Sequence, residues 1–394
     1  MSNDFILKSR IGEYPIQWKI NKLGEVAFVT KLAGFEFTEY MSYKDDGEII
    51  AIRALNLKKG KLYLKDVKRI DKEVSENLQR SKLFKNDIVF SYVGTIGEVA
   101  IIEENNKYHL APNVAKIVVN NSCNSRFLTY YLTSEFALKE IKRLLTTSSQ
   151  PALSMGNIRE IQIPMPTLEE QQKIASILST WDKAIELKEK LIEQKKEQKK
   201  GLMQKLLTGE MRLIGFNDVW QEEKLGDITE ISTGNKDNQN KVEDGLYPFF
   251  VRSENIERIN SYSYDGEAIL IPGDGRIGQI YHYINEKFDF HQRVYKISDF
   301  DKKCNGKFIY YYLQQFFHRE AMKYSAKATV DSLRMPLLTG MVIQLPDLKE
   351  QISIVDILNN SDKEIALLEN ELNVIKVQKK GLMQLLLTGK VRVK

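Results

Sequence analysis

The chain has 394 residues, of which 42% are hydrophobic and 28% charged, and a formal net charge of +5. This length and composition exclude both a single small domain and an intrinsically disordered chain. The short apolar runs exclude a membrane-spanning helix, and two distant cysteines, Cys123 and Cys304, exclude a disulfide scaffold, so we expect a cytoplasmic protein of several domains.

Residues 16–165 are predicted to form a mixed α/β domain. Short strand-like runs, including 87–91 and 115–119, are separated by Gly, Asn and Asp turns, and a helix is expected near Phe127–Leu145. Polar loops between these elements carry side chains that can bond base edges or phosphates of DNA. The candidate DNA-binding residues of this domain are Arg53, Asn56, Thr95, Asn113, Ser148 and Gln150.

A long helix is predicted between Pro166 and Gly209, which are typical start and stop residues. Apolar residues recur in alternate steps of four and three, as along the seam of a coiled coil, and about 40 residues would make a rod of roughly 60 Å. Lys195 and Lys199 interrupt this seam, which leaves open two amphipathic helices packed separately on their own domains. The apolar seam positions are Ile174, Leu178, Trp181, Ile185, Leu202 and Leu206.

Residues 213–345 are predicted to form a second mixed domain, with strands at 268–271 and 294–297 and a helix near Phe308–Lys323. The run Gly273-Asp-Gly-Arg-Ile-Gly278 satisfies G-x-G-x-x-G after a strand. The residues that follow it alternate like another strand, so we predict a tight turn and not a cofactor loop. The candidate DNA-binding residues of this domain are Arg252, Asn255, Arg276, His291, Gln292, Arg293 and Lys327.

The chain repeats itself, because residues 346–389 match residues 166–209 at 24 of 44 positions with a constant offset of 180. This is a duplicated module, and it predicts a second long helix with the same seam. Arg276 stands where the first half has Thr95, and such unshared residues are expected to read different bases. The seam positions of the second helix are Ile354, Leu358, Ile365, Leu368, Leu372, Leu382 and Leu386.

The sequence offers no recognisable catalytic constellation. It contains no G-x-x-x-x-G-K-[S/T] loop, and its four histidines lack metal-ligand spacing apart from the pair His282 and His291. We therefore predict no catalytic residues, no bound metal and no cofactor in this chain. An unrecognised enzyme site around 273–278 and the histidine pair remains one alternative, and a protein-interaction scaffold remains another.

On these features the chain resembles the specificity subunit of type I restriction–modification enzymes. The resemblance is carried by the repeated Pro-x-Leu-x-Glu-Gln helix starts and Lys-Gly-Leu-Met-Gln helix ends, by the Trp…Lys-Leu-Gly domain openings at 18–24 and 220–226, and by Ser149-Gln-Pro-Ala-Leu-Ser154. The second half departs from it, with Ala328-Thr-Val-Asp-Ser332 in place of the Ser-Gln-Pro segment.

The resemblance implies an α+β fold of two α/β target-recognition domains separated by two long helices that form an antiparallel coiled coil. The four segments would be 1–165, 166–212, 213–345 and 346–394. Residues 213–345 contain 16 basic and 19 acidic residues. This slightly negative segment is not expected to bind DNA strongly by itself.

The resemblance also implies a non-catalytic subunit of a defence system against foreign DNA. Each domain would read one half of a bipartite site in double-stranded DNA, while the coiled coil would set the gap and dock two methyltransferase subunits. Restriction/translocase subunits would complete the complex, with S-adenosylmethionine, ATP and Mg on the partners. A type II-like restriction–methylation system with the same kind of specificity chain is an alternative within this class.

Overall fold

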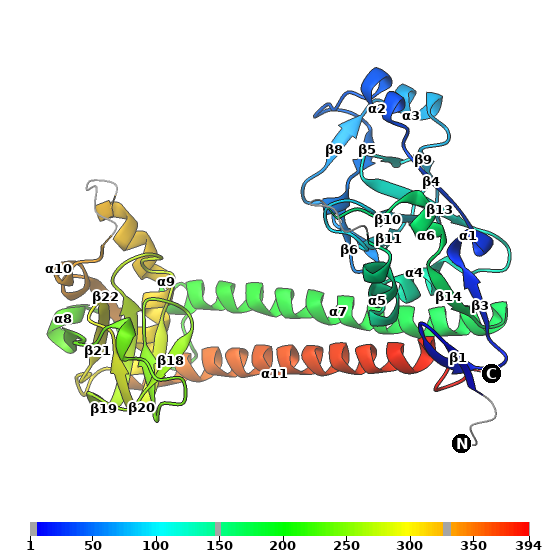
Figure 1. The fold of residues 1–394 in the computed structure, drawn as a ribbon. Helices are drawn as coiled ribbons and strands as arrows, with labels where there is room; N and C mark the ends of the chain where they lie inside the picture. The colour runs from blue at the N-terminus through cyan, green and yellow to red at the C-terminus, as the bar shows by residue number, and fades with distance from the viewer. Residues whose placement is uncertain (1–5, 146–150, 326–331, 394) are drawn as a thin grey trace. The chain divides into compact units, whose positions relative to one another are not determined.

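The computed structural model describes residues 6–145, 151–325 and 332–393. It divides into two compact units, the first made of Met1–Leu187 with Leu372–Lys394 and the second of Lys188–Glu371. The long helices α7 (Leu168–Leu207) and α11 (Leu348–Leu387) each contribute one end to each unit. Each unit therefore combines one mixed α/β region with the start of one long helix and the end of the other (Figure 1).

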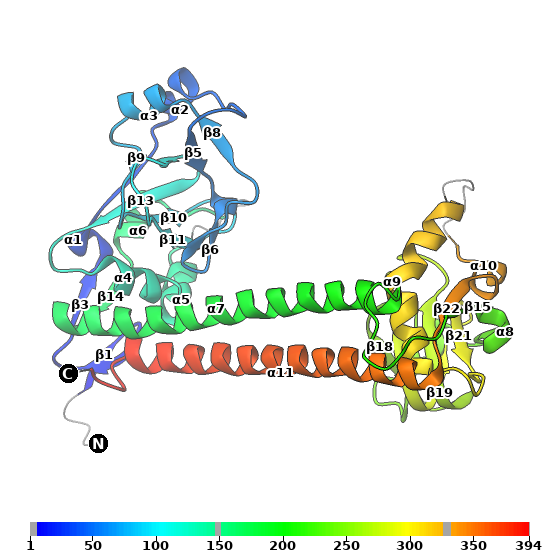
Figure 2. The same cartoon turned by 180° about the vertical axis from the view of Figure 1, so that it is seen from behind.

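The first unit contains a four-stranded sheet in the order β11-β10-β13-β4 and another in the order β8-β5-β12-β9. Its elements before α7 are β1 (Ile6–Ser9), β2 (Gly12–Pro15), β3 (Lys19–Lys22), α1 (Leu23–Val26), β4 (Ala27–Lys31), α2 (Gly34–Tyr40), β5 (Ile49–Ile52), η2 (Ala54–Asn56), β6 (Leu57–Lys58), β7 (Lys61–Leu62), β8 (Lys68–Ile70), α3 (Lys72–Asn77), β9 (Lys82–Leu83), β10 (Ile88–Ser91), β11 (Val99–Ile101), β12 (Tyr108–Leu110), β13 (Val114–Val119), α4 (Ser125–Leu132), α5 (Glu135–Arg143), α6 (Met155–Arg159) and β14 (Gln162–Met165). Figure 2 shows α4 and β14 beside α7, while β5, β8, α2 and α3 lie at the end of the unit remote from α7.

The second unit is built on a six-stranded sheet in the order β16-β21-β19-β20-β17-β18. Its elements between α7 and α11 are β15 (Gln221–Lys224), α8 (Leu225–Ile228), β16 (Glu230–Thr233), η3 (Asn238–Asn240), β17 (Tyr247–Phe250), β18 (Ile256–Ile259), β19 (Tyr264–Pro272), β20 (His282–Phe290), β21 (Val294–Ser298), α9 (Gly306–Ser325), α10 (Met335–Thr339) and β22 (Val342–Leu345). The predicted α+β fold with two α/β regions is thus confirmed.

The ends of the long helices belong to the hydrophobic cores of the units. The main core of the first unit includes Leu178 of α7 and Leu386 of α11, together with the buried Trp18. The main core of the second unit includes Leu206 of α7 and Leu358 of α11. Burial of these side chains fixes each helix end to its domain through the hydrophobic effect.

Two local predictions meet different outcomes in the structure. The helix expected over Phe127–Leu145 is divided into α4 and α5, because Ser134 caps α5 by accepting a hydrogen bond from the Ala137 amide. The G-x-G-x-x-G run is followed by β20 and not by a helix, as predicted. No helix in the described residues is both long and apolar enough to cross a membrane.

A Glu-Gln pair is repeated at the start of each long helix, and the glutamine makes the same contacts in both units. The Gln171 amide is buried and donates to the carbonyls of Pro166 (3.0 Å) and Ser122 (3.1 Å). Its oxygen accepts from the Asn124 amide (2.8 Å), at the N-cap of α4. Gln351 makes the same three kinds of bond in the second unit. This glutamine therefore ties the start of the long helix to the adjoining domain helix.

The neighbouring glutamate links the first turn of one long helix to an arginine that follows the end of the other long helix. The Glu170 carboxylate accepts from the Trp18 indole (3.2 Å) and from two nitrogens of Arg392 (2.7 and 2.8 Å). In the second unit Glu350 accepts from Trp220 (3.1 Å) and from two nitrogens of Arg212. A bidentate pair of this kind fixes geometry as well as charge.

The helix end turns sharply at the repeated glycine. Gly389 has a φ of 68°, and a Cβ there would lie 2.5 Å from Pro15 Cγ and 3.0 Å from the Trp18 ring. Only glycine fits both the left-handed backbone and the close approach. Gly209 shares the left-handed backbone, with a φ of 71°, but a Cβ there would meet the Trp220 ring at an ordinary 3.6 Å, so the backbone conformation is what the two glycines have in common.

Within each unit the two long helices run antiparallel. In the second unit Lys188 pairs with Glu371 (2.7 Å) and Lys195 with Glu364 (2.6 Å), so partner numbers fall along α11 as they rise along α7. In the first unit Lys379 pairs with Asp182 (2.7 Å). All thirteen apolar seam residues named above are buried or half-buried.

Candidate nucleic-acid interface

A parallel strand pair gathers the polar candidates of the first unit. Strands β5 and β12 run parallel, so their carboxyl ends lie at the same edge of the sheet. Just beyond that edge the Ala111 amide donates to the Ile52 carbonyl (3.1 Å). Arg53 and Asn113, which follow these residues, are therefore brought to one edge, where Arg53 is half-buried and Asn113 exposed.

The turn 92–97 adjoins the same edge. The Tyr92 amide donates to the Asn113 carbonyl (3.1 Å), and positive φ angles at Gly94 (81°) and Gly97 (89°) let the chain reverse there. Thr95, at the tip of the turn, is exposed. Val93 forms a bridge with Ala152. The other two candidates of this domain, Ser148 and Gln150, lie outside the described residues.

Arg53 and Asn56 have different surroundings. Asn56 is buried, its side-chain amide donates to the carbonyls of Tyr63 (3.0 Å) and Asp66 (2.7 Å), and its oxygen accepts from the Arg53 amide (3.1 Å). The polar atoms of Asn56 are thus used inside the loop, where they hold its shape. The Arg53 guanidinium pairs with the Asp66 carboxylate (3.0 Å) at the surface of the same loop.

The second unit has the same backbone arrangement with different side chains at the edge. Strands β17 and β20 are parallel, and the His291 amide donates to the Phe250 carbonyl (2.9 Å) where they end. Arg252 and Arg293 both reach the half-buried Asp274 carboxylate, at 3.1 and 3.0 Å. One carboxylate thus orients two exposed guanidinium groups, each of which retains other donors for a ligand.

The turn 273–278 lies beside these arginines. The Gly273 amide donates to the Arg293 carbonyl (2.8 Å), which is the counterpart of the Tyr92 bond in the first unit. Arg276 is exposed at the tip of the turn and pairs with Glu254. Asn255 is exposed in the loop after Arg252, and Lys327 lies outside the described residues.

His291 and Gln292 differ in access. The His291 ring is 3% exposed, and burial, with Arg252 nearby, lowers its pKa although Asp237 lies 3.6 Å from Nε2. Its Nδ1 accepts from the Arg293 amide (2.9 Å), so the ring supports the loop. The exposed Gln292 side chain bonds Asp237 (3.3 Å) and is the better placed of the two for a ligand.

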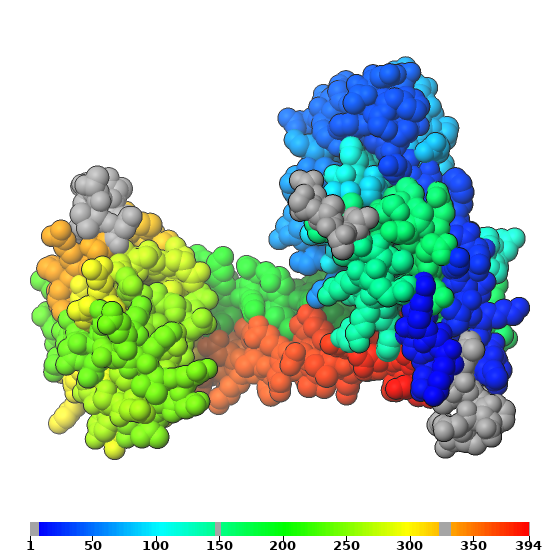
Figure 3. All heavy atoms as spheres, viewed as in Figure 1, coloured from blue at the N-terminus to red at the C-terminus, as the bar shows by residue number. Residues whose placement is uncertain are grey.

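The first unit contains a basic stretch that the mild net charge of +5 for the whole chain does not reveal. Residues 58–85 contain ten lysines and arginines but four acidic residues, and most of the basic side chains are exposed. They lie on β6 to β9 and α3, within the blue and light-blue surface of the first unit in Figure 3. A charge count in short windows would have found this stretch. The exposed cations suit phosphate groups.

A metal-ligand cluster was the clearest chemical alternative, and it can be checked in the part of the chain that the structure describes. There, no group of three His, Cys, Asp or Glu residues is placed to hold a metal ion. The histidine pair considered above has separate partners, with His282 Nε2 at 3.2 Å from the Ser253 carbonyl and His291 at Asp237.

The comparisons with known proteins agree over most of the chain. Residues 15–196 and 217–377 match the family model described as the type I restriction modification DNA specificity domain. The MjaX and MjaVIII specificity subunits of Methanocaldococcus jannaschii type I restriction enzymes are each 27% identical to this chain. Those alignments cover 98% and 96% of this chain and 96% and 94% of the relatives.

Solved structures share the fold. The S subunit of a type I restriction-modification system from M. genitalium has a TM-score of 0.64 at 16% identity, covering 94% of this chain and 96% of its own. A chain solved in work on assembly and conformational transition of the type I R-M system has a TM-score of 0.61, also at 16% identity, covering 96% and 99%. By its two matched regions, the chain belongs to the type I restriction modification DNA specificity family.

Proposed function

We propose that this chain is the DNA-specificity subunit of a type I restriction–modification complex, with each unit reading one half of a bipartite site. The observation that carries the proposal is the repeated edge at which a parallel strand pair and a Gly-containing turn bring polar residues together. The same framework carries Thr95 and Asn113 in one unit and Arg276 and Arg293 in the other. Two frameworks with unlike side chains suit an asymmetric target.

The exposed side chains have the chemistry for this role. Arginine can donate two bonds to the O6 and N7 of guanine, and asparagine or glutamine can pair with adenine. Arg252, Arg276, Gln292 and Arg293 supply such groups in the second unit. In the first unit Asn113 and Thr95 supply them, with Arg53 at the rim and the lysines of 58–85 on phosphates. In the second unit Asp274 orients Arg252 and Arg293, and Asp237 accepts a hydrogen bond from Gln292.

The long helices also leave apolar side chains outside their seam. Leu187, Leu191, Leu367, Val374 and Val377 are exposed by 37% to 65%, and an exposed apolar surface favours a protein partner. We assign these positions to the docking of methyltransferase subunits, with the seam setting the gap between half-sites. The division at 1–165, 166–212, 213–345 and 346–394 is the functional division we propose.

The remaining parts of the proposal concern the complex. The chain would act without catalytic residues of its own in the cytoplasm. S-adenosylmethionine would be bound by the methyltransferase partners, and ATP with Mg by the restriction/translocase partners. Each of these assignments rests on family membership.

The test is to express the chain with the methyltransferase encoded beside it and to map methylated bases genome-wide by single-molecule sequencing. We expect a split motif with two short specific halves around a fixed nonspecific gap. A matched strain carrying Arg252→Ala and Arg293→Ala should change one half only. An active methyltransferase that produced no motif with this chain would contradict the proposal.

A further inference from the structure

The Asp274 carboxylate holds two arginine side chains of the second unit at one point. Nη1 of Arg252 lies 3.1 Å and Nη1 of Arg293 lies 3.0 Å from the same carboxylate oxygen, Oδ2. The exposed fraction of the side chain is 16% for Asp274, 42% for Arg252 and 64% for Arg293. The carboxylate is thus largely covered, while both of the arginine side chains that it contacts are exposed to a ligand.

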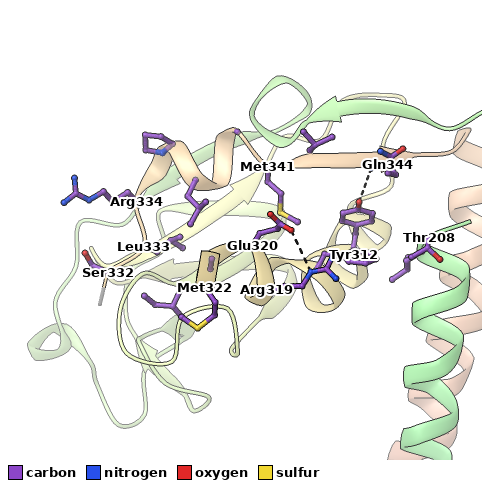
Figure 4. A pocket seen from close by; sticks show the side chains of 18 residues that line it. Thr208, Tyr312, Arg319, Glu320, Met322, Ser332, Leu333, Arg334, Met341 and Gln344 are labelled. Carbon is purple, nitrogen blue, oxygen red and sulfur yellow. Dashed lines mark hydrogen bonds and ion pairs between the residues drawn. The ribbon is translucent and has the colours of Figure 1, made fainter. Parts of the chain in front are cut away.

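The turn that carries Asp274 is anchored to the core of the second unit. The Leu333 amide donates to the Gly273 carbonyl (2.6 Å), and Asp274 forms a bridge with Ser332. Leu333 is buried in the main core, and the Tyr295 hydroxyl donates to its carbonyl (2.9 Å). Figure 4 shows Ser332 and Leu333 on the segment that leads to α10. The backbone at Asp274 is therefore held in place by buried neighbours.

The backbone that carries the two arginines is also held. The Arg293 amide donates to the buried His291 ring (2.9 Å), and the Arg293 carbonyl accepts from the Gly273 amide (2.8 Å). Arg252 follows the buried Val251 at the end of β17. The two side chains thus start from fixed positions and meet on one fixed carboxylate, so their arrangement is organised before any ligand binds.

Each guanidinium retains a pair of parallel donors. The contact with Asp274 uses Nη1, and Nε and Nη2 form another edge of the same plane, which can donate two parallel bonds. Such a fork matches the O6 and N7 acceptors of guanine in the major groove. Because both Nη1 atoms lie within 3.1 Å of one oxygen, they are separated by less than two base-pair steps of about 3.4 Å each. The two forks can therefore engage neighbouring base pairs.

The carboxylate also favours a base over a phosphate as the ligand. A phosphate beside Asp274 would be repelled by its negative charge, whereas the neutral acceptor atoms of a base would not. Residues 213–345 contain 16 basic and 19 acidic residues, so this segment has no excess of positive charge for the DNA backbone. Two oriented forks in such surroundings suit the edges of bases.

The first unit has neither the carboxylate nor this arginine at the equivalent positions. The backbone bond at the start of the turn makes Asn113 the counterpart of Arg293, and the β-bridge of the following residue makes Val93 the counterpart of Asp274. The carboxylate and the arginine are therefore present together in one unit and absent together from the other. Since the turn itself, with its two glycines at positive φ, forms in both units, the carboxylate is needed for the arginines and not for the turn.

We propose that the second unit recognises two adjacent G·C base pairs, in either orientation, through the guanines that Arg252 and Arg293 contact, and that Asp274 is the positioning residue for both arginines. The inference rests on the proposed function and deepens it by naming bases in one half of the target. It places no such requirement on the half-site of the first unit.

The methylated motif of the chain with its methyltransferase gives the first test. The half that is relaxed by Arg252→Ala with Arg293→Ala should contain two adjacent G·C pairs. A relaxed half without them would overturn this inference and leave the proposed function standing. An active methyltransferase that produced no motif would overturn the proposed function and this inference with it.

Base analogues test the contact atoms in the assembled complex. A duplex with 7-deazaguanine lacks the N7 acceptor of the major groove, whereas inosine keeps O6 and N7 and loses only the amino group of the minor groove. We expect 7-deazaguanine at either position to weaken binding about fivefold or more, and inosine to change it by less than about twofold. In Arg293→Ala the analogue should have no effect at one position, and in Arg252→Ala at the other. Equal sensitivity in the native chain and both variants would overturn the assignment.

Variants of Asp274 separate positioning from folding. Asp274→Asn keeps the shape and loses the charge, so the preference for guanine should fall at both positions together. Affinity for DNA without the motif should not fall, because a negative charge has been removed from the interface. Asp274→Glu keeps a carboxylate and should retain more of the preference than Asp274→Asn.

The matched control is Asp265→Asn, at an exposed position near the other end of β19, which should change neither the preference nor the affinity. A loss of affinity in Asp274→Asn that was equal for DNA with and without the motif would indicate a structural role and contradict the proposal. A guanine preference in Asp274→Asn equal to that of the native chain, or no advantage of Asp274→Glu over Asp274→Asn, would contradict it as well.

Discussion

Glu170 is a buried carboxylate that accepts hydrogen bonds from the Trp18 indole, from the Arg392 guanidinium and from the Val393 amide (3.4 Å). Its side chain is 5% exposed and that of Arg392 is 37% exposed. Glu170→Gln would keep the shape but leave Arg392 without its bidentate partner. We expect a loss of about 1.5 kcal/mol in the free energy of unfolding, since the charge-assisted hydrogen bonds are weakened while the partly exposed Arg392 can still be solvated.

Chemical denaturation measures this loss, and Glu169→Gln is the matched control on the adjacent residue. Glu169 is 76% exposed and pairs with Lys173 in the first turn of the same helix, so no measurable change is expected. Equal stability of the Glu170→Gln and Glu169→Gln proteins would show that the repeated Trp–Glu–Arg contact does not hold the helix end.

His109 gives the first unit a defined pH dependence. The ring is buried beside Ser75, and burial, followed by Lys116 and Lys82, lowers its pKa to about 4. As the pH falls through about 6.5, the unfolded chain takes up a proton at this histidine while the folded chain does not. The contribution of the neutral His109 to the free energy of unfolding is therefore fully present above that pH. It falls between pH 6.5 and 4, by on the order of 3 kcal/mol in total.

The measurement compares the pH dependence of unfolding in the native chain and in His109→Gln. The glutamine does not titrate, so its curve should lack the part of the decline that begins near pH 6.5. Carboxylates titrate in both proteins and cancel in the difference. Parallel curves over the whole range would contradict the assignment.

At the scale of the elements, each unit holds a Lys–Asp–Tyr contact that the apolar pattern did not anticipate. In the first unit Lys379 pairs with Asp182 (2.7 Å), whose other oxygen accepts from the Tyr130 hydroxyl (2.6 Å). The lysine also lies over the tyrosine ring, 5.4 Å from its centroid. The second unit repeats the contact with Lys199, Asp362 and Tyr311.

A double-mutant cycle tests whether this contact is energetically coupled. Lys379→Met and Asp182→Asn should each destabilise the protein, and together by less than the sum, with a coupling of about 1 kcal/mol because both side chains are largely buried. The matched control is the exposed pair Lys196 and Glu369, for which coupling below about 0.5 kcal/mol is expected. Equal coupling in both cycles would argue against a special role.

The long helices and the later strands follow from periodicity and turn residues, and the structure contains them where they are predicted. Apolar periodicity does not explain why a lysine stands at position 199 of the seam, because its partners are Asp362 on α11 and Tyr311 on α9. Asn56 and Asn255 occupy similar sequence positions, yet Asn56 is buried and Asn255 exposed. Sequence similarity alone cannot separate a loop-forming amide from an exposed one.

At the scale of the whole molecule, the duplication explains why each unit draws on both repeats. Glu170 lies in the first turn of α7 and pairs with Arg392, which follows α11. Glu350 lies in the first turn of α11 and pairs with Arg212, which follows α7. Offset counting finds the repeat but does not reveal that the two halves exchange their helix ends. That exchange depends on long-range contacts, which the order of residues along the chain does not contain.

The two edges predict that the halves of the target are read independently. Arg252→Ala with Arg293→Ala removes two guanidinium groups from the second unit without touching Asn113 or Thr95 in the first. A bond from one side chain to a base edge supplies roughly 1–3 kcal/mol of discrimination, so the corresponding half of the methylated motif should become relaxed while the other half and the gap are unchanged.

The reciprocal change is Asn113→Ala with Thr95→Ala, which should relax the opposite half of the motif. Lys58→Ala with Lys61→Ala is the sequence-independent control, because a lysine on a phosphate adds affinity without base identity. It should weaken DNA binding uniformly and lower the slope of log affinity against log salt by about 0.9 for each phosphate that is no longer neutralised. If either pair of edge substitutions altered both halves of the motif together, the two units would not be separate readers.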